Sequence, residues 1–549
     1  MSTLFDVFGF LSVLLHGLEL VAQTVTVGSV LFALVIVRRD ADRPDPDRAR
    51  TARIVRIAAM TLVGTTLASI GLRTLVLATT LQLAPLGLIT AQFAWTGLIR
   101  ALAAAGIAVL AHPQRITSEL TDAGSGVLAG IVLATAVAGS HAAARLDDAA
   151  AAYLATIAHQ LGAALWLGGL PCFHAALRHA SARHAERLGR RYSRASIAGV
   201  ALIVLGATGY AVVYIGSPGA AYGTAYGAMA LAKAALLAVL LWLGLQNFRS
   251  IRRGLADAGG VQRLGRTVVV EMGVGLAALM AAASITSTPP AADLVDDRVT
   301  IHELAERWRP QVPRLSSPEH ASLSLPALQA RLDAEALERH DVRRPGAFVP
   351  GEGEPPPRNA YDVAWSEYNH HWAGVLVFAM GFAALLGRSG RVGWAMHWPL
   401  LFVVLAAIVF VRGDPEVWPL GDIGFFESLK DPEVVQHRMF VVIMIAFALF
   451  EWRVQSGRSR SRAAAFAFPL LVALGATLLL AHSHALGNAK EELMVETTHL
   501  PVAVLGVVAG WSRWLEVEAH DQRDGRVGGV LWPLCFMVIG LLLLNYREA

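Results

Sequence analysis

The sequence has little charge and almost no cysteine. Only 16% of its 549 residues are charged, against roughly a quarter in soluble domains, and 55% are hydrophobic. This balance excludes an ordinary soluble enzyme. The two cysteines, Cys172 and Cys535, lie far apart in separate apolar runs, so they can build neither a disulfide framework nor a thiolate metal cluster.

Three further absences narrow the function. There is no Gly-x-x-x-x-Gly-Lys-Ser/Thr loop, which argues against ATP-driven pumping by this chain alone. The net charge of +4 comes from basic residues clustered between apolar runs, so it indicates a membrane-lipid partner and no nucleic acid. No basic residue precedes Arg38 and no small-residue cleavage pattern is present, so the first run is predicted to be a retained span.

Fourteen apolar runs are long enough to cross a bilayer core of about 30 Å as helices. The predicted fold is therefore all-α, a polytopic transmembrane helical bundle of about 14 spans with a small extracytoplasmic insert. We expect an eight-span membrane domain over 1–288, an insert over 289–367 and a six-span domain over 368–549. The runs cover residues 7–37, 54–80, 88–111, 124–141, 151–177, 195–216, 226–248, 267–287, 369–387, 394–411, 437–453, 463–482, 493–512 and 528–545.

Arginine-rich loops set the predicted orientation, because positively charged loops stay in the cytoplasm. The loops after the first, fifth and seventh runs are rich in arginine, whereas 216–225 has no Lys or Arg and 142–150 has only Arg145. The second half repeats this alternation. Both termini are therefore predicted to lie outside the cytoplasm.

The polar stretch 289–365 separates the two halves. It opens with Pro289-Pro290 and carries further prolines near its end. Within it, 299–309 and 325–340 have helical apolar spacing, which predicts a small cap of two helices on the outer side.

The predicted topology also sorts the histidines by side. His141 ends the fourth span and His159 lies early in the fifth, so adjacent antiparallel helices would bring them to similar depth, near His16. We interpret them as shared metal ligands, because neutral imidazole suits copper, zinc, nickel and iron. The alternative is that each caps a helix or bonds a backbone carbonyl. The histidines predicted to be on the outer side are His16, His141, His159, His370, His371, His437, His482, His484 and His499.

The second half echoes the first. Ser140-His141-Ala142 is followed by His159, and Ser483-His484-Ala485 is followed by His499, which suggests an internal duplication. Both pairs straddle a polar loop on the predicted outer side.

Carboxylates accompany the later histidines. Glu492, Glu496 and His499 share one helix face, and Glu367 with His370 repeats a Glu-x-x-His spacing. Such pairs can hold di-iron sites in helical bundles. The alternative is a solvated outer turn.

Charged residues inside spans face protein or a polar path. An ion pair such as Glu19 with a basic partner would fix helix register, whereas Lys233 could hold a carboxylate or repel a cation. The charged residues inside the runs are Glu19, Arg73, Arg100, Lys233 and Glu271.

A glycine pair marks the fifth run. The glycines of Trp166-Leu167-Gly168-Gly169-Leu170 predict close helix approach. Cys172 and His174 follow toward the inner side, where they could receive Cu(I). The alternative is that Cys172 is a small buried hydrophobe.

An ordered series of motifs resembles the CopD copper-resistance membrane proteins. The series comprises Ser140-His141-Ala142, His159, Trp166 to Leu170, Tyr192-Ser193, Gly206-Ala207-Thr208-Gly209, Tyr222-Gly223-Thr224-Ala225-Tyr226-Gly227, Lys233 and Gln246-Asn247. The resemblance covers roughly 140–250, and the eight-span pattern covers 1–288. It implies a bacterial inner-membrane protein of copper homeostasis that moves copper from periplasm toward cytoplasm. His141 and His159 match the family's histidines, and Trp166, Gly168, Gly169 and Lys233 match structural or path residues.

The resemblance leaves parts of the chain unmatched. No copper-binding domain of the CopC type is fused here, so a separate periplasmic copper chaperone is a possible partner, and the last six spans lie outside the matched part. The leading prediction is copper transport or delivery. The alternatives are a redox protein binding b-type haem through helix histidines, or a metal-dependent enzyme in the second half. The predicted metal ligands are His16, His141, His159, His370, His371, His484, Glu496 and His499.

Overall fold

The protein was analysed as a computed structural model, and its described residues form helices without any β-strand, as predicted. The structure describes residues 2–37, 46–82, 84–111, 119–145, 147–255, 257–286, 288–294, 298–318, 360–415, 417–421, 423–429, 432–480, 489–519 and 522–548.

The chain divides into two compact units. The first bundle comprises residues 11–221 and 233–295, and the second bundle comprises residues 1–10, 222–232 and 296–549.

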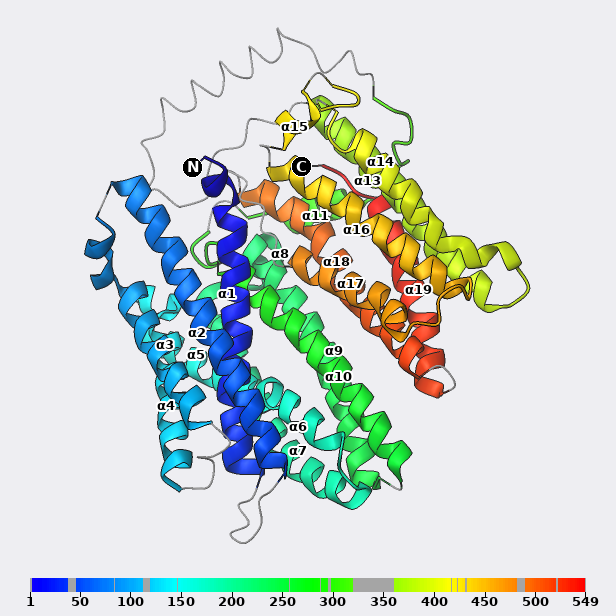
Figure 1. Cartoon of the computed structure of the whole chain (residues 1–549). Coiled ribbons are helices and arrows are strands. Elements are labelled where there is room, and N and C mark those ends of the chain that lie inside the picture. Colours follow the sequence, from blue (N-terminus) through cyan, green and yellow to red (C-terminus); the bar gives the residue numbers. More distant parts are fainter. Residues whose placement is uncertain are drawn as a thin grey trace. The chain divides into compact units, whose positions relative to one another are not determined.

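The first bundle contains most of the helices of the first half, although the ends of α1, α8 and α9 extend into the second unit. Figure 1 shows them in chain order. The elements are α1 (Ser2–Leu31), η1 (Phe32–Ile36), α2 (Pro46–Leu81), η2 (Pro85–Thr90), α3 (Gln92–Leu110), α4 (Glu119–Ala138), η3 (His141–Ala144), α5 (Ala149–Ala163), η4 (Ala164–Gly168), α6 (Leu170–Leu177), α7 (Ala182–Tyr210), η5 (Ala211–Ile215), α8 (Pro218–Gly223), α9 (Ala225–Arg253) and α10 (Ala258–Ile285).

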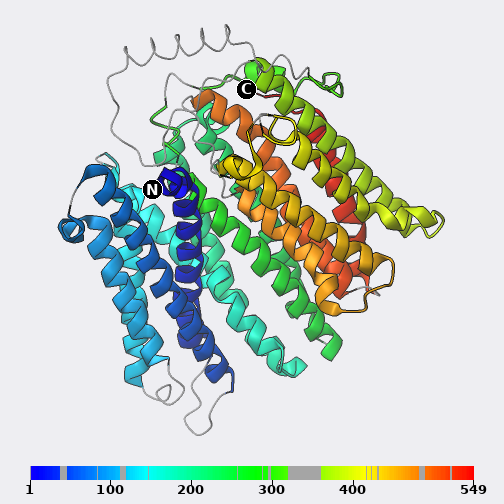
Figure 2. The same ribbon diagram turned by 45° about the horizontal axis from the view of Figure 1, so that its top comes forward.

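The second bundle contains the remaining helices. In both views α13 and α19 run side by side, as do α18 and α19 (Figure 1, Figure 2). The elements are α11 (Ile301–Trp308), α13 (Ala360–Arg388), η7 (Gly393–Leu400), α14 (Leu401–Arg412), α15 (Phe425–Ser428), α16 (Pro432–Gln455), α17 (Arg462–Leu480), α18 (Ala489–Glu518) and α19 (Arg523–Leu544).

Thirteen helices of the described residues are long and apolar enough to cross a membrane. They correspond to thirteen of the fourteen predicted runs, which confirms the polytopic helical fold. The remaining run, 437–453, lies in α16, which is helical but carries Arg438, Glu451 and Arg453 and is not one of the thirteen. Within the insert, α11 confirms the helix predicted over 299–309, whereas 325–340 lies outside the described residues.

Glycine brings helices of the first bundle into close contact, as the Gly168-Gly169 pair predicts. A Cβ atom added to Gly28 of α1 would lie 2.5 Å from the Cα of Gly168. Because that distance is too short for any side chain, α1 and the π-helical turn η4 can approach each other only through glycine. This contact fixes α1 against the segment that leads into α6.

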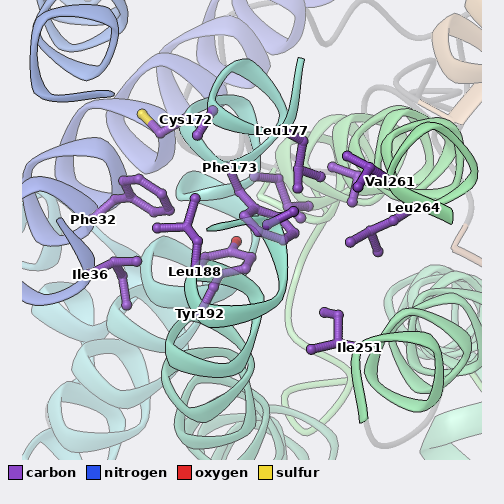
Figure 3. Close-up of a cluster of buried hydrophobic side chains, with 14 of the residues drawn as sticks. Phe32, Ile36, Cys172, Phe173, Leu177, Leu188, Tyr192, Ile251, Val261 and Leu264 are labelled. Atoms are coloured by element: carbon purple, nitrogen blue, oxygen red, sulfur yellow. The ribbon is translucent and has the colours of Figure 1, made fainter. Parts of the chain in front are cut away.

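An apolar cluster closes one end of the first bundle (Figure 3). Phe173 stacks on Tyr192 with ring centroids 4.7 Å apart, and Phe32 meets Tyr192 edge-on at 5.6 Å. Cys172 belongs to this cluster and is 1% exposed. The cluster therefore joins η1, α6 and α7 around a buried thiol.

Aromatic rings fill the interior of the second bundle. Phe468 of α17 lies within 6.4 Å, centroid to centroid, of rings on η7, α14, α16 and α19. Its side chain is 1% exposed. The same core includes Trp398, Phe402 and Trp532. These interlocked rings form an apolar core in the middle of the bundle.

Candidate functional site

A line of polar residues runs along α1 in the first bundle. His16, Glu19, Gln23, Thr26 and Ser29 follow one another at spacings of three or four residues, so they share one side of the helix. His16 is half-buried, and the other four are buried. At 1.5 Å per residue, the rise from His16 to Ser29 is about 20 Å, or roughly two thirds of a bilayer core. We call these five residues the α1 polar face.

Glu19 forms a buried ion pair about one turn from the His16 end of this face. Its Oε1 atom lies 2.5 Å from Nη1 of Arg100 on α3 and accepts a hydrogen bond of 2.9 Å from Thr66. Nη2 of Arg100 also donates to the Thr135 carbonyl at 3.0 Å. The predicted pairing of Glu19 with a basic residue is therefore confirmed, and it fixes α1 against α2, α3 and α4.

The α1 polar face continues to a thiol. Nε2 of Gln23 donates to Oε1 of Gln160 on α5 at 3.2 Å. Further along, the Cys172 thiol lies beside the hydroxyls of Ser29 and Thr51. The face therefore begins at an imidazole and ends at a soft sulfur donor.

The histidines of the first bundle are placed differently from the prediction of one shared site. His141 is exposed, and its Nε2 lies 3.1 Å from the Thr286 carbonyl. His159 rests on Tyr210, with centroids 5.3 Å apart, and its Nδ1 lies 3.3 Å from the Ile203 carbonyl. Both thus adopt the carbonyl-bonded alternative. His141 instead lies within electrostatic range of His16.

Glu271 and Lys233 are two further charged residues of the predicted spans, whereas Arg73, also predicted inside a span, is exposed. Glu271 accepts hydrogen bonds from Trp166 Nε1 at 2.6 Å and from Asn247 Nδ2 at 2.5 Å. Lys233 lies within electrostatic range of His159. Glu271 is therefore bonded to Trp166, one of the residues on which the CopD resemblance rests. Its carboxylate oxygens connect α10 to η4 and to α9.

A second histidine cluster lies in the second bundle, at the end predicted to be outer. His370 of α13 and His499 of α18 have ring centroids 6.0 Å apart. Tyr546 stacks on His370 at 3.8 Å and meets His499 edge-on at 6.0 Å. The structure therefore brings two of the predicted ligands together and adds a tyrosine from the segment after α19.

His371 and Glu496 lie near this pair but have separate surroundings. Nδ1 of His371 accepts a hydrogen bond of 2.7 Å from the Arg314 backbone N–H, and its Nε2 donates to the Tyr546 carbonyl at 2.9 Å. Glu496 is 1% exposed and lies one turn before His499 on α18. His371 is consequently a positioning group for the tail and the insert.

Residues 298–318 of the insert form a strap across the same end. Arg307 donates to the Glu548 carbonyl at 2.9 Å and to the Met494 carbonyl at 3.2 Å, and Trp372 donates to the Leu315 carbonyl at 3.1 Å. Burial lowers the pKa of Arg307. Thr300 and Glu303 form the capping box of α11, and the hydrogen bonds from Thr300 lower the pKa of Glu303.

The opposite end of the second bundle holds a charge network. Arg513 binds Glu451 at 2.5 Å and Glu516 at 2.6 Å, and Glu516 also accepts hydrogen bonds from Trp532 and Arg388. These residues belong to α13, α16, α18 and α19. The network therefore joins four helices by charge at one end, where it has a structural role.

No three His, Cys, Asp or Glu side chains of the described residues are grouped closely enough to hold a metal ion. His484 lies outside the described residues, so the echoed tripeptide has no structural description. Sequence reasoning missed Gln160, Thr51 and Tyr546. Gln160 follows His159 inside an apolar run, which could have indicated a buried polar partner of α1, whereas Thr51 lies among the arginines between Arg48 and Arg56 and had no such signal. Tyr546 follows the last span and had no such signal.

The comparisons with known proteins give one match. The family model CopD, described as copper resistance protein D, matches residues 186–285. This stretch contains the resemblance motifs from Tyr192 to Asn247, whereas His141 and His159 precede it. Neither the curated proteins nor the solved structures gave a match. This match confirms the predicted CopD resemblance and overlaps its motifs over 186–250, and the chain is a multi-pass membrane protein of which residues 186–285 match the CopD model.

Proposed function

We propose that the chain carries copper from the periplasm toward the cytoplasm through the first bundle, along the α1 polar face. The main support for this proposal is that the polar face is continuous and buried from Glu19 to Ser29. The CopD match within the same bundle supports copper as the cargo. The proposal places the protein in a bacterial inner membrane, with both termini in the periplasm and a separate periplasmic chaperone as copper donor.

The donor types along the face suit this cargo. Imidazoles of His16 and His141 lie at the entrance, and imidazole suits copper. The Cys172 sulfur lies at the far end, and soft sulfur ligands select Cu(I). Between them, Gln23 and Gln160 offer amide oxygens without a fixed charge.

The ion pair one turn beyond His16 serves two purposes in this proposal. Glu19 lowers the cost of a cation at this depth, while Arg100 neutralises the carboxylate and prevents it from trapping the ion. A site that binds too tightly would stop conduction. The pair therefore favours passage over storage.

Copper accumulation in cells tests the entrance. We expect the double variant His16→Ala/His141→Ala to reduce accumulation to the level of cells without the protein. His302→Ala is the matched control, because this histidine is exposed on α11. Copper accumulation equal to that of the wild type in the double variant would refute the proposal that copper enters at His16 and His141.

The buried cysteines offer a matched pair for the exit. Cys172→Ala removes the thiol beside Ser29 and should slow accumulation. Cys535→Ala removes a thiol that is equally buried in the second bundle, and should not. Equal effects of the two substitutions would show that the Cys172 sulfur has no part in transport.

A further inference from the structure

Two imidazoles in the second bundle are held in the same tautomer. Nδ1 of His370 lies 2.8 Å from the Ser366 carbonyl, and Nδ1 of His499 lies 3.0 Å from the Val495 carbonyl. In each case the acceptor is the carbonyl four residues earlier in the same helix. A neutral ring that donates from Nδ1 carries its lone pair on Nε2, and metal-binding histidines commonly use this second-shell hydrogen bond.

The distance between the rings fits a bridging ion. A ring nitrogen lies roughly 1 Å from its ring centre, and a metal–nitrogen bond is about 2 Å. Two imidazoles bridged in line by one ion therefore have centres roughly 6 Å apart, and the centroids of His370 and His499 are 6.0 Å apart. We propose that one Cu(I) ion binds between His370 and His499, coordinated by Nε2 of each ring.

The number of donors selects the kind of ion. Zinc takes three or four protein ligands, and no group of three His, Cys, Asp or Glu occurs among the described residues. Cu(I) is stable with two ligands in line, and imidazole suits copper. Two donors therefore select Cu(I) over zinc.

The position of Tyr546 argues against haem at this pair. Its ring lies 3.8 Å from His370 and 6.0 Å from His499, so it flanks the space between them. A planar macrocycle coordinated by both rings would have to occupy that flank. A single ion needs no such room.

The surroundings give the ion both cover and access. A partly open cavity of about 90 Å³ lies under the strap and is lined by Arg314, Glu367, His371 and Tyr546, among others. Tyr546 thus lines the cavity while its ring stacks on His370. Oxygen atoms of the cavity, such as those of Glu367, can contact an approaching cation, and both histidines are half-buried.

This site does not depend on the transport path of the first bundle, and the experiment separates the two. Full-length protein carrying His16→Ala, His141→Ala and Cys172→Ala serves as the parent. It is titrated anaerobically with Cu(I) against a chromophoric Cu(I) chelator. We expect the parent to bind one equivalent tightly, and His370→Leu/His499→Leu added to it to weaken that binding at least 100-fold. His397→Leu, at the other end of the bundle, is the matched control.

A conservative variant keeps the test valid if the leucine variant fails to fold. In His499→Met the thioether replaces imidazole as a Cu(I) ligand, so binding should persist and X-ray absorption should show one copper–sulfur shell. Undiminished binding by the leucine double variant would overturn the proposal. A methionine variant that binds copper without a sulfur neighbour would overturn it as well.

Discussion

The two bundles differ in what fills their middle. The interior of the first contains the α1 polar face, with the Glu19–Arg100 pair about one turn from His16. The interior of the second contains interlocked aromatic rings around Phe468, and its histidines and charges lie at the two ends. The proposed path therefore lies in the bundle with a polar interior, whereas the proposed site of the other bundle lies at its end.

This difference shows where charge can be placed in a membrane bundle. A charge inside a span must be paired or must line a polar route. Arg513 is paired with Glu451 and Glu516 at a helix end. Arg100 is paired along a polar face that continues in both directions. Of the two arginines, only Arg100 lies on a face that would offer a passing cation successive polar side chains.

The largest expected effect comes from breaking the buried pair of the first bundle. Glu19→Gln keeps the size of the side chain but leaves the Arg100 guanidinium, which is 9% exposed, without its counter-charge. We expect the free energy of unfolding to fall by roughly 4 kcal/mol. Denaturant unfolding in detergent measures it.

The control is a pair on the surface of the same bundle. Glu186→Gln breaks the exposed contact with Arg190, which should cost less than about 1 kcal/mol. If both substitutions had the same small effect, Glu19 and Arg100 would not be the buried pair described above.

A somewhat smaller loss is expected from opening the aromatic core of the second bundle. Phe468→Ala removes a fully buried ring and should lower the free energy of unfolding by about 3 kcal/mol. Copper accumulation per folded molecule should be unchanged, because the proposed path lies in the first bundle. A change in copper accumulation at equal protein level would contradict the proposal that copper passes through the first bundle alone.

The smallest effect concerns the strap. Hydrogen bonds from Thr300 lower the pKa of Glu303 below its ordinary value. The capping box is therefore fully formed above the ordinary glutamate pKa, and its contribution is lost as the pH falls through the lowered pKa. Amide hydrogen exchange of Glu303 should be protected at pH 6 and accelerate below pH 4, after correction for the intrinsic rate.

A matched variant isolates the carboxylate. Glu303→Gln should show weaker protection of the same amide that does not vary between these two pH values. A wild-type protein whose protection does not change on acidification would contradict the role of the box.

Much of the fold could be predicted from sequence, because apolar length and glycine spacing are local properties. The spans, the helix at 301–308, the close approach at Gly168 and the pairing of Glu19 follow from such patterns. Helix rotation is not local. His141 lies in η3, after the end of α4, whereas His159 lies ten residues into α5, and the two rings bond different carbonyls.

The candidate sites show the same limit. Periodicity places His16, Glu19 and Gln23 on one face, but it cannot identify Gln160 as the opposite partner. Likewise, Tyr546 stacks on His370 only because the chain turns back after α19. Partners of this kind depend on tertiary packing.

Copper flux into proteoliposomes of purified protein tests the central claim most directly. Gln23→Leu replaces the middle of the α1 polar face with an apolar side chain of similar size and leaves both ends intact. We predict that it lowers the initial rate of Cu(I) entry at least 10-fold, while Thr477→Val, at a buried hydroxyl of the second bundle, leaves the rate unchanged. An unchanged rate with Gln23→Leu would contradict passage along α1.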